Sequence, residues 1–202
     1  MRIVDNRPAN DGFAAARKAM IDSQLRTSGV NARFVLERML SVPREDFVPE
    51  EARGSAYIDR AVPLGDNRFL AAPVFHGLML QEAAPRLGDD ALVVDSGSGY
   101  LAELVRPMVG SLAVITPAQA IAGEGATGPF SLLLVDGAVE HVPAPLAALL
   151  AKDGRAFTGL VEGSVTRLAA GRHSGEAVAL LPLAEIGIPA LPEFARPKAW
   201  TF

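Results

Sequence analysis

The chain has 202 residues, half of them apolar, with a formal net charge of −4 at pH 7 and no cysteine. This length and apolar content fit one compact domain, and the acidic balance gives no reason to expect nucleic acid or an anionic membrane as a partner. The absence of cysteine excludes disulfides, thiolate zinc sites and cysteine nucleophiles. The three histidines lack metal-ligand spacing, so we expect no metal site.

The sequence contains no window of about 18 apolar residues and no signal-peptide pattern. We therefore expect no membrane segment and a cytoplasmic location. The sequence does not indicate an oligomeric state.

The first third of the chain is dominated by helical patterns. Residues 1–12 are polar and rich in turn formers, which predicts a loosely held arm. A helix is predicted from Phe13, and Asn31 is a candidate cap for a second helix that ends at Pro43. Pro49 suits the start of a third helix. The first helix presents one apolar stripe, formed by Phe13, Ala16, Met20, Ile21 and Leu25.

Residues 74–84 predict a helix that precedes the first core strand. Its inner face would carry Phe75, Leu78 and Met79. His76 lies in this segment, and we interpret it as a helix-face residue rather than a ligand of a metal or substrate.

The most informative stretch, residues 91–100, reads Ala-Leu-Val-Val-Asp-Ser-Gly-Ser-Gly-Tyr. An apolar run predicts a buried strand, Gly97 and Gly99 predict a tight turn, and a helical pattern begins at Leu101. This strand, glycine turn and helix can cradle a nucleotide, because glycines permit close backbone approach and the helix N-terminus offers free N–H groups. No third glycine follows, which disfavours a dinucleotide pyrophosphate and fits S-adenosylmethionine. The purely steric need for glycine in such a turn is the alternative.

Two further strands are predicted at 112–115 and 130–135. The interval between them is too short for two crossovers, since each needs at least about 10–12 residues. At least one helix, with or without a strand, is therefore missing from this interval. Asp136 follows the second of these strands, where residues of an open α/β sheet face the ligand crevice. The Asp136-Gly137 pair is also ordinary turn chemistry, and we expect His141 to be exposed in the following loop.

The C-terminal part predicts a short helix at 145–150, closed by residues 152–154. Three strands follow at 155–161, 164–170 and 177–181, joined by turns at Gly163, Gly171 and Gly175. This spacing predicts an antiparallel edge. Residues 186–202 would form an extended tail that Trp200 and Phe202 anchor.

Three fragments, followed by the glycine motif, carry a family resemblance. Residues 20–26 (Met-Ile-Asp-Ser-Gln-Leu-Arg), 42–49 (Val-Pro-Arg-Glu-Asp-Phe-Val-Pro) and 56–57 (Ala-Tyr) precede Asp-x-Gly-x-Gly-Tyr at 95–100. In this order they resemble protein-L-isoaspartate O-methyltransferases over roughly residues 15–160. The resemblance implies an α/β, Rossmann-like S-adenosylmethionine-dependent methyltransferase fold. Its sheet would be mostly parallel with antiparallel edge strands.

The resemblance also implies how the chain is divided. Residues 1–88 would form an N-terminal helical segment with the substrate-side loop. Residues 89–202 would form the Rossmann-like core with the C-terminal tail, and both parts would belong to one compact domain.

Residues 63–73 resemble the family's substrate-side loop, whose Thr-Ile-Ser borders the isoaspartyl carboxylate. Aligning the shared prolines and glycine places Phe69, Leu70 and Ala71 at these three positions, and Ala72 at the following glutamine. Phenylalanine and alanine cannot hydrogen-bond a carboxylate through their side chains, so the loop has changed chemically where hydroxyls and an amide are expected. A merely packed loop is the alternative interpretation.

The cofactor pocket predicted from the sequence is incomplete at its ribose end. Rossmann-like folds place an acidic residue about 20 positions after the glycines, but 114–118 contain no carboxylate, and Thr116 offers only a weaker hydrogen bond. The family resemblance places Glu124 near the adenine, although a flexible glycine-rich loop is an equal alternative. The candidate cofactor contacts are Asp95, Ser96, Gly97, Ser98, Gly99, Thr116, Glu124 and Gly125, and the candidate substrate contacts are Phe69, Leu70, Ala71 and Asp136.

Three functions remain open. The family resemblance implies methyl transfer from S-adenosylmethionine to a carboxylate of isoaspartyl residues in proteins, a protein-repair reaction. The missing acid and the altered loop favour a non-catalytic family member that acts as a binding module. The third possible function is methyl transfer to a different acceptor, which the apolar loop 69–71 would bind. No catalytic residue is assigned, because a carboxylate and a sulfonium need little acid–base help.

Overall fold

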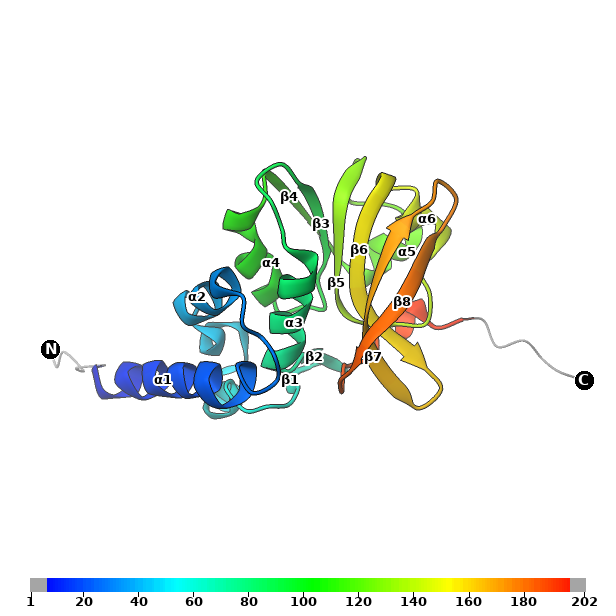
Figure 1. The fold of residues 1–202 in the computed structure, drawn as a ribbon. Coiled ribbons are helices and arrows are strands. Elements are labelled where there is room, and N and C mark those ends of the chain that lie inside the picture. Colours follow the sequence, from blue (N-terminus) through cyan, green and yellow to red (C-terminus); the bar gives the residue numbers. More distant parts are fainter. Residues whose placement is uncertain (1–6, 197–202) are drawn as a thin grey trace, which may run out of the picture.

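The computed structural model describes residues 7–196, which form a six-stranded sheet with helices on both faces and a helical N-terminal segment (Figure 1). The sheet order is β4-β3-β5-β6-β7-β8, parallel from β4 to β6 and antiparallel beyond. The strands of this sheet are β3 (Asp90–Val94), β4 (Ser111–Ile115), β5 (Phe130–Val139), β6 (Leu150–Glu162), β7 (Val165–His173) and β8 (Val178–Glu185).

The N-terminal segment is helical, as predicted, but its first helix is longer. Helix α1 (Arg7–Met20) begins inside the expected arm and runs directly into a π-helical turn, η1 (Ile21–Leu25). The predicted arm therefore extends at most to residue 6, and residues 1–6 lie outside the described part. The apolar stripe is confirmed, since Met20, Ile21 and Leu25 are buried in the core.

The remaining helical pieces of this segment are α2 (Arg33–Ser41), η2 (Arg44–Phe47) and η3 (Glu50–Ser55). The predicted Asn31 cap for α2 is wrong. Ala32 is the N-cap residue, and no side chain caps the first turn. Just before the helix, Oε1 of Gln81 on α3 (Pro73–Ala83) accepts the N–H groups of Asn31 at 2.8 Å and Ala32 at 2.9 Å, which fixes the chain that enters α2.

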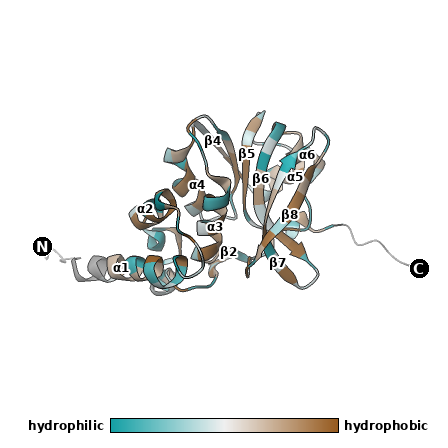
Figure 2. Cartoon of the chain, in the orientation of Figure 1, coloured by the Kyte–Doolittle hydropathy of each residue, from teal (hydrophilic) through white to brown (hydrophobic). Residues whose placement is uncertain are grey.

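Alternating side chains of the central strands build two cores, one on each face of the sheet. One face packs against α3, α4 (Tyr100–Val105) and the N-terminal helices. The other packs against α5 (Pro117–Ala122), α6 (Ala144–Ala147) and the C-terminal turn η5 (Pro192–Phe194). Strands buried on both faces read as continuous apolar runs, and β5 carries hydrophobic colours in Figure 2.

The shortened interval after β4 holds α5 and no strand in the described chain, so β4 is the sheet edge. A strand is therefore absent here as well as a helix, a point that the sequence left open. A short 3-10 turn, η4 (Arg106–Met108), follows α4 as the predicted Pro107 interruption requires.

The antiparallel edge is confirmed, with three differences in extent. Strand β6 starts at Leu150, so the predicted helix shrinks to α6 and residues 152–154 belong to the strand. Gly171 lies inside β7 rather than in a turn. After β8 the chain returns to the sheet, where Ala138 of β5 bridges Ala190. Trp200 and Phe202, predicted to anchor the tail, lie outside the described residues.

Candidate functional site

The glycine turn lies at the carboxyl end of β3 and is shaped by Asp95. The Asp95 carboxylate accepts the backbone N–H groups of Gly97 and Gly99, each at 2.9 Å. Both glycines have positive φ values, +117° at Gly97 and +74° at Gly99, which disfavour any residue with a Cβ. Burial and the nearby Asp136 charge raise the pKa of Asp95, against the lowering effect of the two N–H groups. Asp95 is thus a structural element of the turn.

Asp136 lies within β5 and is buried, so the alternative interpretation of Asp136-Gly137 as an ordinary turn is wrong. It occupies an irregular stretch of the strand between Leu134 and Ala138, where the pairing with β6 shifts. Its carboxylate receives the Oγ of Ser96 at 3.2 Å and contacts the Oγ of Ser98 at 3.5 Å. The carboxylate therefore joins β5 to the glycine turn.

His76 is the second buried partner of this carboxylate. Its Nε2 lies 2.8 Å from Oδ1 of Asp136, and both side chains are fully buried. His76 lies on helix α3, as the sequence predicts, and the helix turns this side chain inward toward β5, a contact that the sequence did not indicate. The hydrophobic pattern of α3 gave no indication of this contact, because residues on nearly every face of the helix are buried.

Arg44 continues the chain of polar contacts from η2. Its guanidinium is fully buried, with Nη1 3.4 Å from Nδ1 of His76 and Nε donating to the carbonyl of Ala56 at 2.7 Å. Nη2 donates to the carbonyl of Ala71, and the guanidinium carbon lies 4.9 Å from the centre of the Tyr100 ring. Because arginine can only donate, Nδ1 of His76 must accept, and we assign the proton to Nε2, which donates to Asp136.

The substrate-side loop is a hairpin of β1 (Val62–Gly65) and β2 (Arg68–Leu70). Of its predicted contacts, Leu70 and Ala71 are buried and Phe69 is half-buried. The single proton of the Ser96 hydroxyl is shared between the Asp136 carboxylate and the carbonyl of Phe69, each 3.2 Å from Oγ. Arg44 donates to the carbonyl of Ala71. These residues thus reach the site through their backbone carbonyls.

Thr116, Glu124 and Gly125 follow β4 and surround α5. Thr116 caps the helix: its Oγ1 accepts the N–H of Gln119, whose side chain in turn accepts the N–H of Thr116. Glu124 and Gly125 are exposed after the helix, and the nearest atoms to a Cβ at Gly125 belong to Gln119. The structure therefore groups these three around α5. The end of β4 just before Thr116 lies beside the glycine turn, because the Asp95 N–H donates to the Ile115 carbonyl at 2.9 Å.

The sequence interpretation missed four side chains that the structure brings to this region. Arg44 and His76 complete the buried chain, and Arg68 and Glu193 form an ion pair over the glycine turn. Their separations in sequence follow no motif spacing, and Arg44 stands beside Glu45 and Asp46 in a charged stretch, so no local signal in the sequence marked these side chains.

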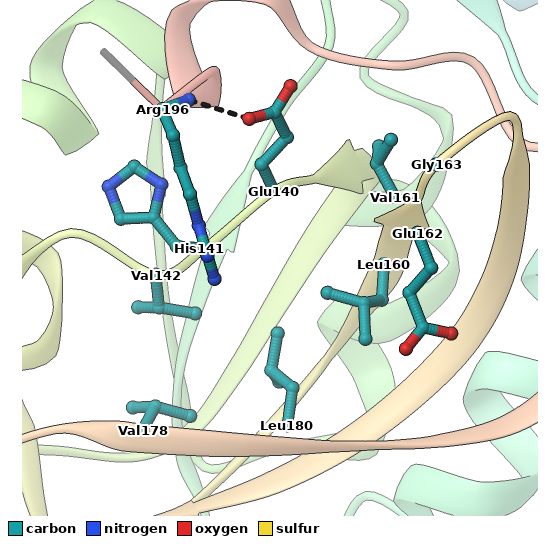
Figure 3. Close-up of a pocket in the computed structure, with 10 residues that line it drawn as sticks. All are labelled: Glu140, His141, Val142, Leu160, Val161, Glu162, Gly163, Val178, Leu180 and Arg196. Carbon is teal, nitrogen blue, oxygen red and sulfur yellow. Dashed lines mark hydrogen bonds between the residues drawn. The ribbon is translucent and has the colours of Figure 1, made fainter. Parts of the chain in front are cut away.

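A separate cavity of about 610 Å³ opens beyond the carboxyl ends of β5 and β6 (Figure 3). Leu160, Val178 and Leu180 form its apolar part, and Arg196 donates its backbone N–H to Glu140 at 2.7 Å on the rim. His141 lines this cavity and is half-buried, so its predicted exposure is wrong. None of the predicted cofactor or substrate contacts lines it. Among residues 7–196, no helix is long and apolar enough to cross a membrane.

Comparison with known proteins places the chain in a family. The family model of protein-L-isoaspartate(D-aspartate) O-methyltransferase matches residues 15–122. The chain is 34% identical to protein-L-isoaspartate O-methyltransferase 2 of Anaeromyxobacter sp. (strain Fw109-5), covering 69% of this chain and 67% of the relative. It is 34% identical to the enzyme of Roseiflexus sp. (strain RS-1), with 71% and 76% coverage, and 37% identical to that of Aeropyrum pernix, with 72% and 66% coverage.

The fold comparison agrees. A beta-aspartate methyltransferase from Plasmodium falciparum, solved in complex with S-adenosyl-L-homocysteine, superposes with a TM-score of 0.67 at 20% identity, over 88% of this chain and 98% of that chain. A second protein-L-isoaspartate O-methyltransferase gives a TM-score of 0.65 at 16% identity, over 87% and 65%. The predicted Rossmann-like methyltransferase fold is confirmed. The chain belongs to the protein-L-isoaspartate O-methyltransferase family.

Proposed function

We propose that this chain transfers a methyl group from S-adenosylmethionine to a side-chain carboxylate of isoaspartyl residues in damaged proteins. Family membership supports the reaction class. The observation that carries the proposal is the open glycine turn at the carboxyl end of β3, where ligands of open α/β sheets bind. A protein-repair role and a cytoplasmic location follow from the same proposal.

The residues around this turn fit the amino-acid end of the cofactor. A Cβ at Gly97 would meet only Arg68, at 3.9 Å, and one at Gly99 would meet nothing within 4 Å. This space beside two positive-φ glycines suits close approach of a ligand to the backbone. At the end of β4 the chain offers the Thr116 hydroxyl and no carboxylate, so we propose a weaker hold on the ribose than an acid would give.

The chemistry requires positioning more than acid–base catalysis. When bound, the cofactor supplies a sulfonium-activated methyl group, and the acceptor carboxylate is already ionised at neutral pH. The chain's task is to hold the acceptor in line and to exclude water. The buried contacts of Ser96 with the Phe69 carbonyl and of Arg44 with the Ala71 carbonyl fix the hairpin relative to the glycine turn.

We keep as proposals the contacts predicted from the sequence. Ser98 and the turn backbone at 95–99 would face the cofactor, and the hairpin 69–71 would border the acceptor. Asp136 is assigned the positioning of Ser96 and Ser98 rather than direct contact with substrate, because it is fully buried. The division into residues 1–88 and 89–202 also stays a prediction.

Calorimetric titration with S-adenosylhomocysteine tests the cofactor first. We expect binding in the micromolar range, and absence of heat at millimolar ligand would overturn the proposal. The second step compares two peptides of one sequence that contain either isoaspartate or aspartate at a single position. Methyl incorporation into the isoaspartyl peptide alone is expected. Cofactor binding with equal or no labelling of both peptides would show that the acceptor is different.

A further inference from the structure

The hairpin that should contact the acceptor offers one cationic side chain beside the glycine turn. Phe69, Leu70 and Ala71 have no polar side-chain atoms, and the last two are buried. Arg68, the first residue of β2, is partly exposed, with a side chain 30% accessible to solvent. Its Cγ is the nearest atom to a Cβ built at Gly97, at 3.9 Å. The Arg68 side chain therefore lies directly beside the exposed glycine.

Arg68 holds a carboxylate of the chain itself. Its two terminal nitrogens donate to the two oxygens of Glu193, Nη1 to Oε2 at 3.2 Å and Nη2 to Oε1. Two parallel hydrogen bonds of this kind are how arginine recognises a carboxylate with defined orientation. Burial raises the pKa of Glu193. The hydrogen bond and the charge of Arg68 have the opposite effect, and the net result is a pKa below the ordinary value for glutamate.

Glu193 is held there by the packing of its neighbours. Phe194 is fully buried and Leu191 nearly so, in the core beside α5. The Leu191 side chain also fills the space above Gly137, where a Cβ would come within 2.6 Å. The turn η5 thus places a carboxylate against the Arg68 guanidinium, which lies 125 residues away in sequence.

We propose that Arg68 is the carboxylate-binding residue of this site and that Glu193 occupies it as an internal competitor. This inference deepens the proposed function. Two carboxylates are available to such a residue in that reaction, one on the acceptor and one on the amino-acid end of the cofactor. The family's loop would recognise a carboxylate through its hydroxyl groups. Phe69 and Ala71 have no hydroxyl, and Arg68 supplies the carboxylate contact in their place.

The charge balance of the reaction gives the expected kinetic signature for the acceptor. A lone pair of the acceptor oxygen forms the bond to the methyl carbon, and the carbon–sulfur bond breaks with its electrons moving to sulfur. The anion becomes a neutral ester and the sulfonium a neutral thioether, with no proton transferred. Because the acceptor loses charge along this path, Arg68 binds the ground state more strongly than the transition state. Its loss should raise KM and leave kcat unchanged or slightly higher.

The kinetic test uses the full chain with Arg68→Gln, Arg68→Lys and Glu193→Gln. Loss of a bidentate, charge-assisted pair corresponds to about 10- to 100-fold in affinity. If Arg68 binds the acceptor carboxylate, we expect Arg68→Gln to raise the KM for the isoaspartyl peptide by that factor. If Arg68 binds the carboxylate of the cofactor, we expect the same factor in the calorimetric Kd of S-adenosylhomocysteine. Arg68→Lys should recover part of it, and Glu193→Gln should improve the same constant several-fold. Arg167→Gln, which breaks an exposed ion pair with Glu185 on β7 and β8, should change neither.

A spectroscopic arm remains valid if the proposed function fails. In Glu193→Gln, the Nε–H resonance of Arg68, identified by its absence in Arg68→Lys, is followed during titration with the isoaspartyl peptide and with S-adenosylhomocysteine. Movement of this resonance with either ligand supports the inference, and the responding ligand identifies the source of the carboxylate. An unmoved resonance with both ligands overturns it. Failure of the methyltransferase proposal itself would appear separately, as an inactive wild-type chain.

Discussion

The imidazole of His76 and the carboxylate of Asp136 form a fully buried contact, 2.8 Å from Nε2 to Oδ1. It joins α3 to β5, two elements 60 residues apart. The imidazole lies between the buried guanidinium of Arg44 and the buried carboxylate, so the polar chain has a basic group at one end and an acidic group at the other. A buried charge without such a partner is strongly destabilising, which explains why the chain runs unbroken from η2 to the glycine turn.

Replacing Asp136 with alanine should therefore destabilise the protein strongly. The change leaves Nε2 of His76 without its acceptor and removes a buried negative charge that attracts the Arg44 guanidinium. The cost expected for removing one partner of such a buried pair is about 3–5 kcal/mol. Asp136→Asn keeps an acceptor and should cost clearly less. Urea unfolding followed by circular dichroism measures both variants. Equal, small losses of less than about 1 kcal/mol would contradict the role assigned to the carboxylate.

Gly97→Val should abolish binding of S-adenosylhomocysteine. Gly97 has a φ of +117° and is exposed beside the proposed ligand space, so a β-branched residue would strain the turn by about 1–3 kcal/mol and fill that space. Calorimetry on the folded variant is the measurement. Gly54→Ala is the control, because Gly54 has open space and an ordinary φ. Unchanged affinity in Gly97→Val would locate the cofactor elsewhere.

Tyr100→Phe should be neutral or stabilising by up to about 1 kcal/mol. Tyr100 is fully buried, and within the described residues its hydroxyl has no hydrogen-bond partner. Its ring packs edge-on against Phe47 with centroids 5.3 Å apart, and phenylalanine keeps this contact. Thermal and urea unfolding provide the comparison. A loss above 1 kcal/mol would mean that the hydroxyl does have a partner in solution.

The ionised Asp89 carboxylate should contribute to the free energy of unfolding, and this contribution should be lost at acid pH. Burial raises the pKa of Asp89, but hydrogen bonds from Ser131, from Arg155 at 2.7 Å and from the Arg86 N–H lower it below its ordinary value. A lowered folded-state pKa contributes stability that is fully present above the unfolded value, about 3.9, and is lost as the pH falls through the folded value.

Asp89→Asn should accordingly cost about 1–3 kcal/mol at pH 7 and lose less stability than the wild type between pH 5 and pH 2. Urea unfolding across this pH range measures both effects. Asp46→Asn is the matched control, since Asp46 is exposed. If the free energy of unfolding changes with pH in the same way in the wild type and in Asp89→Asn, Asp89 does not make the proposed contribution.

Local patterns in the sequence were sufficient for the main elements of the fold. The apolar runs at 91–94 and 130–135 and the glycine turn between strand and helix predict a parallel core, and β3, β5 and α4 agree. Such elements are readable because their burial or turn geometry depends on residues close together in the chain. Family resemblance added the methyltransferase fold, which the comparisons confirm.

Boundaries were predicted less well where distant partners determine them. Strand β6 extends back to Leu150 because Phe130 of β5 pairs with it there, and Lys152-Asp153-Gly154 looks locally like a turn. The start of α2 likewise depends on a distant partner, because Gln81 of α3 accepts the backbone N–H groups of Asn31 and Ala32 and fixes the chain that enters the helix.

The amino-acid sequence by itself determined which stretches form the sheet and where its glycine turn lies, since both depend on backbone preference and local apolar pattern. Only the tertiary structure decided the polar contacts around that turn. Asp136 became a buried carboxylate and not a turn residue because α3 brings His76 against it. Arg68 met Glu193 across 125 residues because Phe194 is buried beside α5. Such pairs follow from how the elements pack, and no spacing in the chain encodes them.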